Sequence, residues 1–290
     1  LCRGQQLDGH VIVAQPGIER GWRAGCIRTC GVAHNRAVDF DHVAAIAGPV
    51  GDALGDIGPG IHRISDWRAA HAEDVDIFVI RGTTVSAEHV ASEREELNLK
   101  KFIYELDVPV IVGGVATTTG ALHLMRAGAA GVLVGFGGGS AHTTRKVLGI
   151  EVPMASAVAE VASARREYLD ESGGRYVHVI ADGSVGRSGD IAKAIACGAD
   201  AVMMGSPLAK ATEAPGLGWH WGSEAHHPEL PRGERVAVGT SGTLEEILLG
   251  PSHAADGSMN LFGALRRAMA TTGYSDVKSF QRVEVLIHRA

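Results

Sequence analysis

The chain has 290 residues, of which 45% are hydrophobic, and its formal net charge at pH 7 is −6. This apolar content is ample for a sizeable core, either in one β/α barrel or in two smaller domains. The acidic balance without a basic stripe argues against nucleic acid as a partner, and no apolar run approaches the roughly 18 residues needed to cross a membrane.

The first seventy residues differ in pattern from the rest of the chain. They are rich in Gly, Arg, His and Ala, and only Val11–Ala14 and Val43–Ile46 are short apolar runs. Residues 1–10 lack the basic stretch and apolar core of a secretory signal, so we expect a cytoplasmic protein. Three β/α units do not fit in this segment, and a truncated gene product or a segment read in a different frame would explain the poor pattern. We therefore divide the chain into residues 1–70 and a β/α portion of residues 71–290.

The four cysteines are too few and too scattered for a disulfide framework. They are Cys2, Cys26, Cys30 and Cys197. Cys26, Cys30 and His34 would share one side of a helix, but three ligands without a fourth make a poor structural zinc site. We expect reduced thiols and no metal site.

Apolar strands alternate with amphipathic helices from about residue 73 onward. Five strands are predicted, at Asp74–Ile80, Val108–Val112, within Gly128–Gly139, at Val177–Ile180 and at Ala201–Met204. Helices between them are predicted at Thr118–Ala127, Ala155–Asp170 and Ser188–Cys197. Near-continuous apolar strands covered by helices indicate a parallel sheet. Each strand ends in glycine or a polar cluster, which favours a barrel rim over a doubly wound sheet.

One βαβ unit, from Val177 to Ser206, carries chemistry at one edge. Asp182-Gly183 and Gly205-Ser206 follow its two strands. Because the carboxyl ends of parallel strands meet at one edge, these residues are expected to lie together, and their unobstructed backbone N–H groups can bind a dianion. Glycines at strand ends also serve merely to turn the chain. Two such ends in one unit nevertheless indicate a polar ligand with a phosphate.

Loops and helices make up the C-terminal part of the chain. A Trp-, His- and Pro-rich stretch at Gly218–Arg235 is typical of a long loop. Helices are predicted at Thr243–Leu249 and Met259–Thr271, with a loop at Gly250–Gly257 between them. A last strand is predicted at Arg282–Ile287.

Several segments resemble the IMP dehydrogenase and GMP reductase family, and particularly its dehydrogenase-related third branch. ADGSVGRSGDIAKAIACGADAVMMGSPLAKATEAPG, residues 181–216, resembles the family's seventh and eighth strand signature almost residue for residue, and GFGGGSAHTT, residues 135–144, resembles the loop after its sixth strand. Residues 108–129 resemble the fifth strand and its helix, and residues 262–280 the C-terminal helix. The resemblance covers about residues 74–290. It implies a TIM (β/α)8-type barrel, incomplete here at its N-terminal side.

The resemblance also implies roles for residues on the barrel rim. Asp182 would hold the ribose of a purine nucleoside monophosphate, IMP or GMP. Small residues would complete the nucleotide site, namely Ser140, Gly183, Ser184, Gly205 and Ser206. Gly114 and Gly135 would lie beside the cofactor, NAD or NADP. The resemblance further implies a homotetramer, and it leaves open whether a monovalent cation such as K⁺ binds the loop at Gly137–Gly139.

The catalytic loop departs from the family motif Gly-Ser-x-Cys-Thr-Thr, because the chain has His142 at the position of the nucleophilic cysteine. In the family the thiolate adds to C2 of the purine, and Thr144 stands at the position that aids attack or departure there. Imidazole is less nucleophilic toward such a carbon, and its adduct would be cationic. Three further positions differ: Arg81–Thr84 lacks the acidic residue that helps place the cofactor, Gly114 replaces an asparagine and Ser184 replaces a glycine.

Three functions therefore stay open at this point. The first is an oxidoreductase of purine nucleotide metabolism, with His142 and Thr144 in its catalytic loop. The second is a nucleotide-binding homologue without turnover, which could be regulatory and which the missing cysteine favours. The third is a truncated remnant, suggested by residues 1–70.

Overall fold

The computed structural model of the chain describes residues 98–107, 109–214, 216–221 and 234–286. It also describes the backbone of four strands that precede residue 98, which are β1 (Val11–Val13), β2 (Gly25–Cys26), β3 (Val43–Ile46) and β4 (Ile77–Arg81). The two apolar runs predicted within residues 1–70 thus both contain strands.

Five parallel strands form the centre of an eight-stranded sheet. After β4 they are β5 (Val110–Val115), β6 (Gly131–Val134), β7 (His178–Asp182) and β8 (Ala201–Met203), and each pairs with the next in chain order. All five predicted strands are confirmed, with their common polarity. The β/α barrel order of the prediction is therefore present from the fourth strand onward.

The flanks of the sheet depart from a regular barrel. β1 is antiparallel to β8 and carries β2 on its other side, while β3 is antiparallel to β4. The order β2-β1-β8-β7-β6-β5-β4-β3 ends in two edge strands, and β2 and β3 are not paired with each other. The predicted barrel, incomplete at its N-terminal side, is confirmed in this form.

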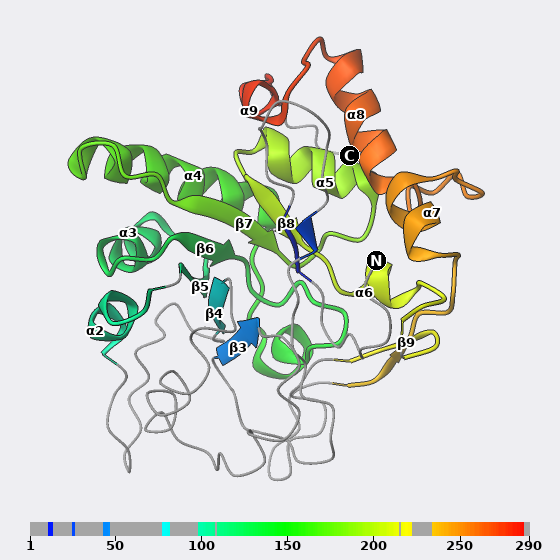
Figure 1. Cartoon of the computed structure of the whole chain (residues 1–290), viewed down its shortest axis with the longest axis horizontal. Coiled ribbons are helices and arrows are strands. Elements are labelled where there is room, and N and C mark those ends of the chain that lie inside the picture. The colour runs from blue at the N-terminus through cyan, green and yellow to red at the C-terminus, as the bar shows by residue number, and fades with distance from the viewer. Residues whose placement is uncertain are drawn as a thin grey trace.

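Helices lie on one side of the parallel strands, and the first four follow the strands in chain order (Figure 1). They are α2 (Leu99–Tyr104), α3 (Thr118–Arg126), α4 (Met154–Glu171), α5 (Ser188–Ala196), α7 (Leu244–Leu249), α8 (Leu261–Thr271) and α9 (Val277–Phe280). α3 packs on α4, α4 on α5, and α5 on α8. One large apolar core joins these helices to the outward side chains of the strands, among them Val112, Val134 and Val179.

The opposite face of the sheet holds a smaller apolar cluster, Ile111, Leu133, Ile180 and Ala201, with Met203 against it. These residues alternate along the strands with those of the main core, as the period of two in a strand requires. They form one layer of side chains across four neighbouring strands, the arrangement that fills a barrel interior. By the same alternation Asp182, two residues after Ile180, lies on the inner face at the end of β7.

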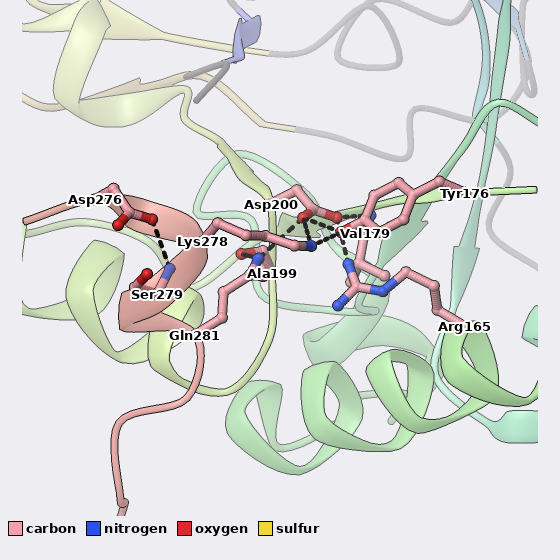
Figure 2. A network of polar contacts seen from close by, with 9 residues as sticks. All are labelled: Arg165, Tyr176, Val179, Ala199, Asp200, Asp276, Lys278, Ser279 and Gln281. Atoms are coloured by element: carbon pink, nitrogen blue, oxygen red, sulfur yellow. Dashed lines mark hydrogen bonds and ion pairs between the residues drawn. The ribbon is translucent and has the colours of Figure 1, made fainter. Parts of the chain in front are cut away.

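A buried polar network lies at the opposite end of the strands, around Asp200 just before β8 (Figure 2). Its carboxylate accepts hydrogen bonds from Arg165 Nη1 at 2.5 Å, Tyr176 Oη at 2.6 Å and the Val179 backbone N–H at 2.9 Å. Gln281 Nε2 adds a fourth at 2.9 Å, which ties the end of α9 to the sheet. In barrels this end supports stability, whereas ligands bind at the other.

Two predictions for the C-terminal part need correction. The strand predicted at Arg282–Ile287 is wrong over its described part, because residues 282–286 have no regular structure and Leu286 is 85% exposed. An apolar run becomes a strand only where a neighbouring strand pairs with it. The stretch Gly218–Arg235 is not wholly a loop either. It contains β9 (Trp219–His220), which pairs antiparallel with β10 (Val236–Ala237).

Candidate functional site

The predicted site residues lie on one rim, at the carboxyl ends of the parallel strands. β7 ends at Asp182, and β8 is followed closely by Gly205 and by Ser206, where the short helix α6 (Ser206–Ala209) begins. Asp182 is in register with Met203, so the two strand ends are direct neighbours. The expectation that these two turns lie together is confirmed.

The turn after β7 has a tight backbone that meets the loop after β6. Gly183 and Ser184 both have positive φ angles, +105° and +56°. The Ser184 N–H donates to the Gly138 carbonyl at 3.0 Å, and a methyl group on Gly183 would lie 3.1 Å from the Gly138 Cα. Glycine at positions 138 and 183 therefore lets the loop after β6 reach the end of β7.

The loop after β6 also reaches the turn after β8. Ser140 Oγ and Ser206 Oγ are 2.5 Å apart and share a hydrogen bond. Because Ser206 is the first residue of α6, this contact places two hydroxyls at the beginning of that helix. Hydroxyls can donate as well as accept, so the pair is suited to an anionic ligand.

His142 lies in this same loop, folded back on Gly139. A methyl group on Gly139 would be 2.5 Å from His142 Cδ2, and the His142 N–H donates to the Gly139 carbonyl at 3.4 Å. The adjacent Ala141 is fully buried, and its carbonyl accepts from the Glu234 N–H at 2.9 Å. The residues just before the histidine are thus held in place.

Thr144 is the first residue of a π-helical turn, η2 (Thr144–Leu148). Such turns are rare and occur frequently at functional sites. Lys146, within this turn, forms a short ion pair with Glu234, the residue that also bonds Ala141. Glu234, just before β10, therefore holds the chain on both sides of His142, at Ala141 and at Lys146.

A second histidine, His220 of β9, belongs to the rim and was not predicted. Its ring lies over Gly205, where a methyl group would be 2.7 Å from Cε1 and 2.9 Å from Nε2. Burial lowers the pKa of His220, and the nearby His142 lowers it further. The signal in the sequence was weak, because a two-residue strand in a Trp- and His-rich stretch has no periodicity to read.

Gly114 and Gly135, predicted to lie beside the cofactor, are buried between strand ends. A methyl group on Gly114 would collide with the Gly135 carbonyl, and it would lie 3.1 Å from the Phe136 ring. Gly135 has a φ of +133° and faces the Asp182 carbonyl and Met154. Close packing accounts for both glycines, and their contact with a cofactor stays a prediction.

Residues 47–226 match the family profile described as the IMP dehydrogenase / GMP reductase domain. The chain belongs to this family. A crystal structure of an IMP dehydrogenase/GMP reductase-like protein from Corynebacterium glutamicum is similar to it with a TM-score of 0.71 and 50% sequence identity, over 79% of this chain and 60% of that one.

The relatives with similar sequences include uncharacterized oxidoreductases and IMP dehydrogenases. An uncharacterized oxidoreductase of Mycolicibacterium smegmatis is 60% identical over 219 residues, 74% of this chain and 58% of that protein. The inosine-5′-monophosphate dehydrogenase of Methanocaldococcus jannaschii is 44% identical over 160 residues, 54% of this chain and 30% of that protein. The chain thus spans 58% of the length of the mycobacterial relative it matches.

Within this IMP dehydrogenase-like fold, other predicted features lie away from the rim or outside the described residues. Cys197 is a free, partly buried thiol at the end of α5, and burial raises its pKa. In the part of the chain that the structure describes, no three His, Cys, Asp or Glu side chains could hold a metal ion, and no helix is long and apolar enough for a membrane span. The Cys30 and His34 side chains and the segment Gly82–Thr84 lie outside the described residues.

Ser184 replaces the second glycine of the family's phosphate turn, and its backbone is left-handed. That conformation costs a non-glycine residue roughly 1–2 kcal/mol. Glycine avoids the cost, but part of the gain is lost because a glycine gives the unfolded chain more conformational entropy. We therefore expect Ser184→Gly to raise the free energy of unfolding by up to about 1 kcal/mol, measured by urea denaturation. Ser184→Ala, which keeps the same backbone demand, is the matched control and should bring no gain. A glycine variant less stable than wild type would contradict this account of the turn.

Proposed function

We propose that this chain binds a purine nucleoside 5′-monophosphate, IMP or GMP, across the rim formed by β6, β7 and β8. The observation that carries the proposal is the meeting of three strand-end segments, through the Ser184 to Gly138 and Ser140 to Ser206 hydrogen bonds. Each segment brings residues that the family uses for a nucleotide. Membership of the IMP dehydrogenase / GMP reductase family supports the choice of a purine ligand.

The phosphate would lie between the turns after β7 and β8. Gly183 and Gly205 leave the backbone accessible there, and the hydroxyls of Ser140 and Ser206 already share a hydrogen bond across the gap. A dianion can replace that bond by accepting from both hydroxyls and from the backbone N–H groups of Gly205 and Ser206. The chain carries a net charge of −6, so the attraction for phosphate has to come from these local donors.

The ribose would lie on Asp182. A carboxylate accepts hydrogen bonds from two vicinal hydroxyls, and Asp182 stands on the inner face at the end of β7, one residue before the phosphate turn. The spacing along the chain therefore follows the order of the groups in the ligand. A deoxynucleotide, which offers one hydroxyl instead of two, should bind more weakly.

We further propose that turnover is slow or absent. His142 stands where the family uses a thiolate, and the imidazole cannot readily form the covalent bond to the purine that the reaction needs. This favours a nucleotide-binding member of an oxidoreductase family over an efficient dehydrogenase or reductase.

A nicotinamide dinucleotide, NAD or NADP, would supply the hydride acceptor or donor if turnover occurs. Gly114 and Gly135, which the resemblance places beside it, are packed against Phe136, Met154 and backbone carbonyls, and this packing alone explains both glycines. Two further proposals follow from the family alone, a homotetramer and a monovalent cation at the loop after β6. The Gly138 and Gly139 carbonyls of that loop already accept hydrogen bonds from Ser184 and His142.

Asp182→Ala is expected to weaken IMP and GMP binding about tenfold to a hundredfold, because a charge-assisted hydrogen bond contributes roughly 1.5–3 kcal/mol. Isothermal titration calorimetry with IMP, GMP and XMP measures this directly. Asp170→Ala, on the exposed end of α4, is the matched control and should bind like wild type. If none of the three nucleotides binds the folded wild-type protein at millimolar concentration, the proposal is wrong.

A further inference from the structure

His220 has an unusual position, beside the residue that begins the proposed phosphate turn of β8. Its ring rests on Gly205, with Cε1 and Nε2 nearest to the place of the missing side chain. Any larger residue at position 205 would push the imidazole away. Glycine at position 205 therefore makes room for the His220 ring as well as forming the turn.

The elements around His220 hold it in this place. β9 pairs with β10 through His220 and Val236, and Trp219 pairs with Ala237. α6, which begins at Ser206, packs on β9. A partly buried ring fixed by a strand pair and a helix loses little conformational entropy when it binds a ligand.

Charged and titratable groups also lie on the elements around His220. On the β10 side, Glu234 pairs with Lys146 and the Arg235 guanidinium lies 4.6 Å from the Trp221 ring. α6 brings Lys210 at its C-terminal cap, and the loop after β6 brings His142. Of these, His142 is the group that affects the protonation of His220.

We propose that His220 is a ligand of the nucleotide phosphate and that it takes up a proton when the nucleotide binds. The inference rests on the proposed function, since it names a further residue of the same site. The phosphate would lie near Gly205 and Ser206, in place of water, with one of its oxygens beside the imidazole. Imidazolium donates a charge-assisted hydrogen bond to a phosphate oxygen, whereas neutral imidazole donates a weaker one.

The direction of the pH dependence follows from the environment of the ring. In the free protein, burial and then His142 lower the pKa of His220, so at neutral pH the ring is mostly neutral. A bound dianion raises that pKa, because it stabilises the charged form. Binding is therefore tightest where His220 is already protonated, and it weakens as the pH rises from the pKa of the free protein through that of the complex.

Calorimetric titration of the full chain with IMP, in two buffers of different ionisation enthalpy at about pH 7, measures the protons exchanged on binding. We expect wild type to take up a fraction of a proton per nucleotide and to lose affinity about tenfold between about pH 6.5 and about pH 8.5. His220→Gln should bind about tenfold more weakly at the lower pH, show a nearly flat profile and take up no proton. His178→Gln, at the opposite end of β7, is the matched control and should keep the wild-type profile.

Inosine, which lacks the phosphate, should show no proton uptake in either protein. A wild type that binds IMP without proton uptake, or a His220→Gln variant that keeps the uptake, would overturn the role of His220 and leave nucleotide binding intact. If IMP and GMP do not bind at all, the proposed function fails and the inference with it.

Discussion

Wild-type protein supplied with IMP and NAD or NADP is expected to form reduced dinucleotide at an undetectable or very low rate, and His142→Cys is expected to raise that rate. The family reaction depends on a thiolate that bonds to C2 of the purine before the hydride leaves. Loss of such a nucleophile typically removes several powers of ten in rate, because the remaining groups can only position the substrate. The absorbance of the reduced dinucleotide measures the reaction.

The site favours a reactive thiol at position 142. The loop holds this residue against Gly139, and His142 is one of the two causes that lower the pKa of His220. A protonated imidazole beside a thiolate stabilises the thiolate and lowers the pKa of the thiol. In His142→Cys the imidazole that lowers the pKa of His220 is gone, so His220 can take the proton of the new thiol.

Val147→Cys is the matched control, because it adds a thiol to the turn η2 at a side chain that is 71% exposed. It should leave the rate at the wild-type level. Robust turnover by wild type that disappears in His142→Ala would contradict the prediction, since it would show that histidine performs the chemistry.

The fold could be predicted from residue 74 onward because the strands carry two signals at once. Each is a short run of β-branched and aliphatic residues, and each ends in glycine or a polar residue, as at Val134-Gly135 and Asp182-Gly183. Parallel strands buried on both faces need the first feature, and a rim with tight turns needs the second. These signals are local, so one sequence suffices to read them.

The rest of the site depends on contacts between segments far apart in the chain. β9 is two residues long, and its partner β10 follows only after residues 221–235, so no alternation of side chains predicts either strand. His220 became a site residue because this pairing places it on Gly205. Asp200 was equally hidden, since it has the sequence context of a turn before β8 and acquires its partners only in the folded chain.

Asp200→Ala is expected to lower the free energy of unfolding by about 3–5 kcal/mol, the usual cost of removing one partner of a buried ion pair. The side chains of Asp200 and Arg165 are only 6% and 8% exposed, and Arg165 Nη1 lies 2.5 Å from Asp200 Oδ2. Figure 2 shows the pair. The variant leaves the guanidinium without its carboxylate and removes the acceptor of Tyr176 Oη and of the Val179 N–H. Urea denaturation followed by circular dichroism measures the change.

The same network predicts a dependence of stability on pH. Burial acts to raise the pKa of Asp200, but Arg165 and the hydrogen bonds from Tyr176, Val179 and Gln281 outweigh it, so the pKa is lowered on folding. A carboxyl with a lowered pKa contributes its stability above the pKa of the unfolded chain, about 3.9 for Asp. That contribution is lost as the pH falls from about 4 through the lower pKa of the folded state, and the difference between wild type and Asp200→Ala should shrink there.

The exposed pair of Arg126 and Glu171, 2.6 Å apart, is the matched control for the buried pair. Glu171→Gln should cause no measurable change, because water screens the charges and the side chains are about half exposed. The double variant Arg165→Met with Asp200→Ala should recover part of the loss of Asp200→Ala, since no charge is then buried alone. An Asp200→Ala protein as stable as wild type at pH 7, or a double variant less stable than the single one, would show that the network does not hold α9 and the strand ends together.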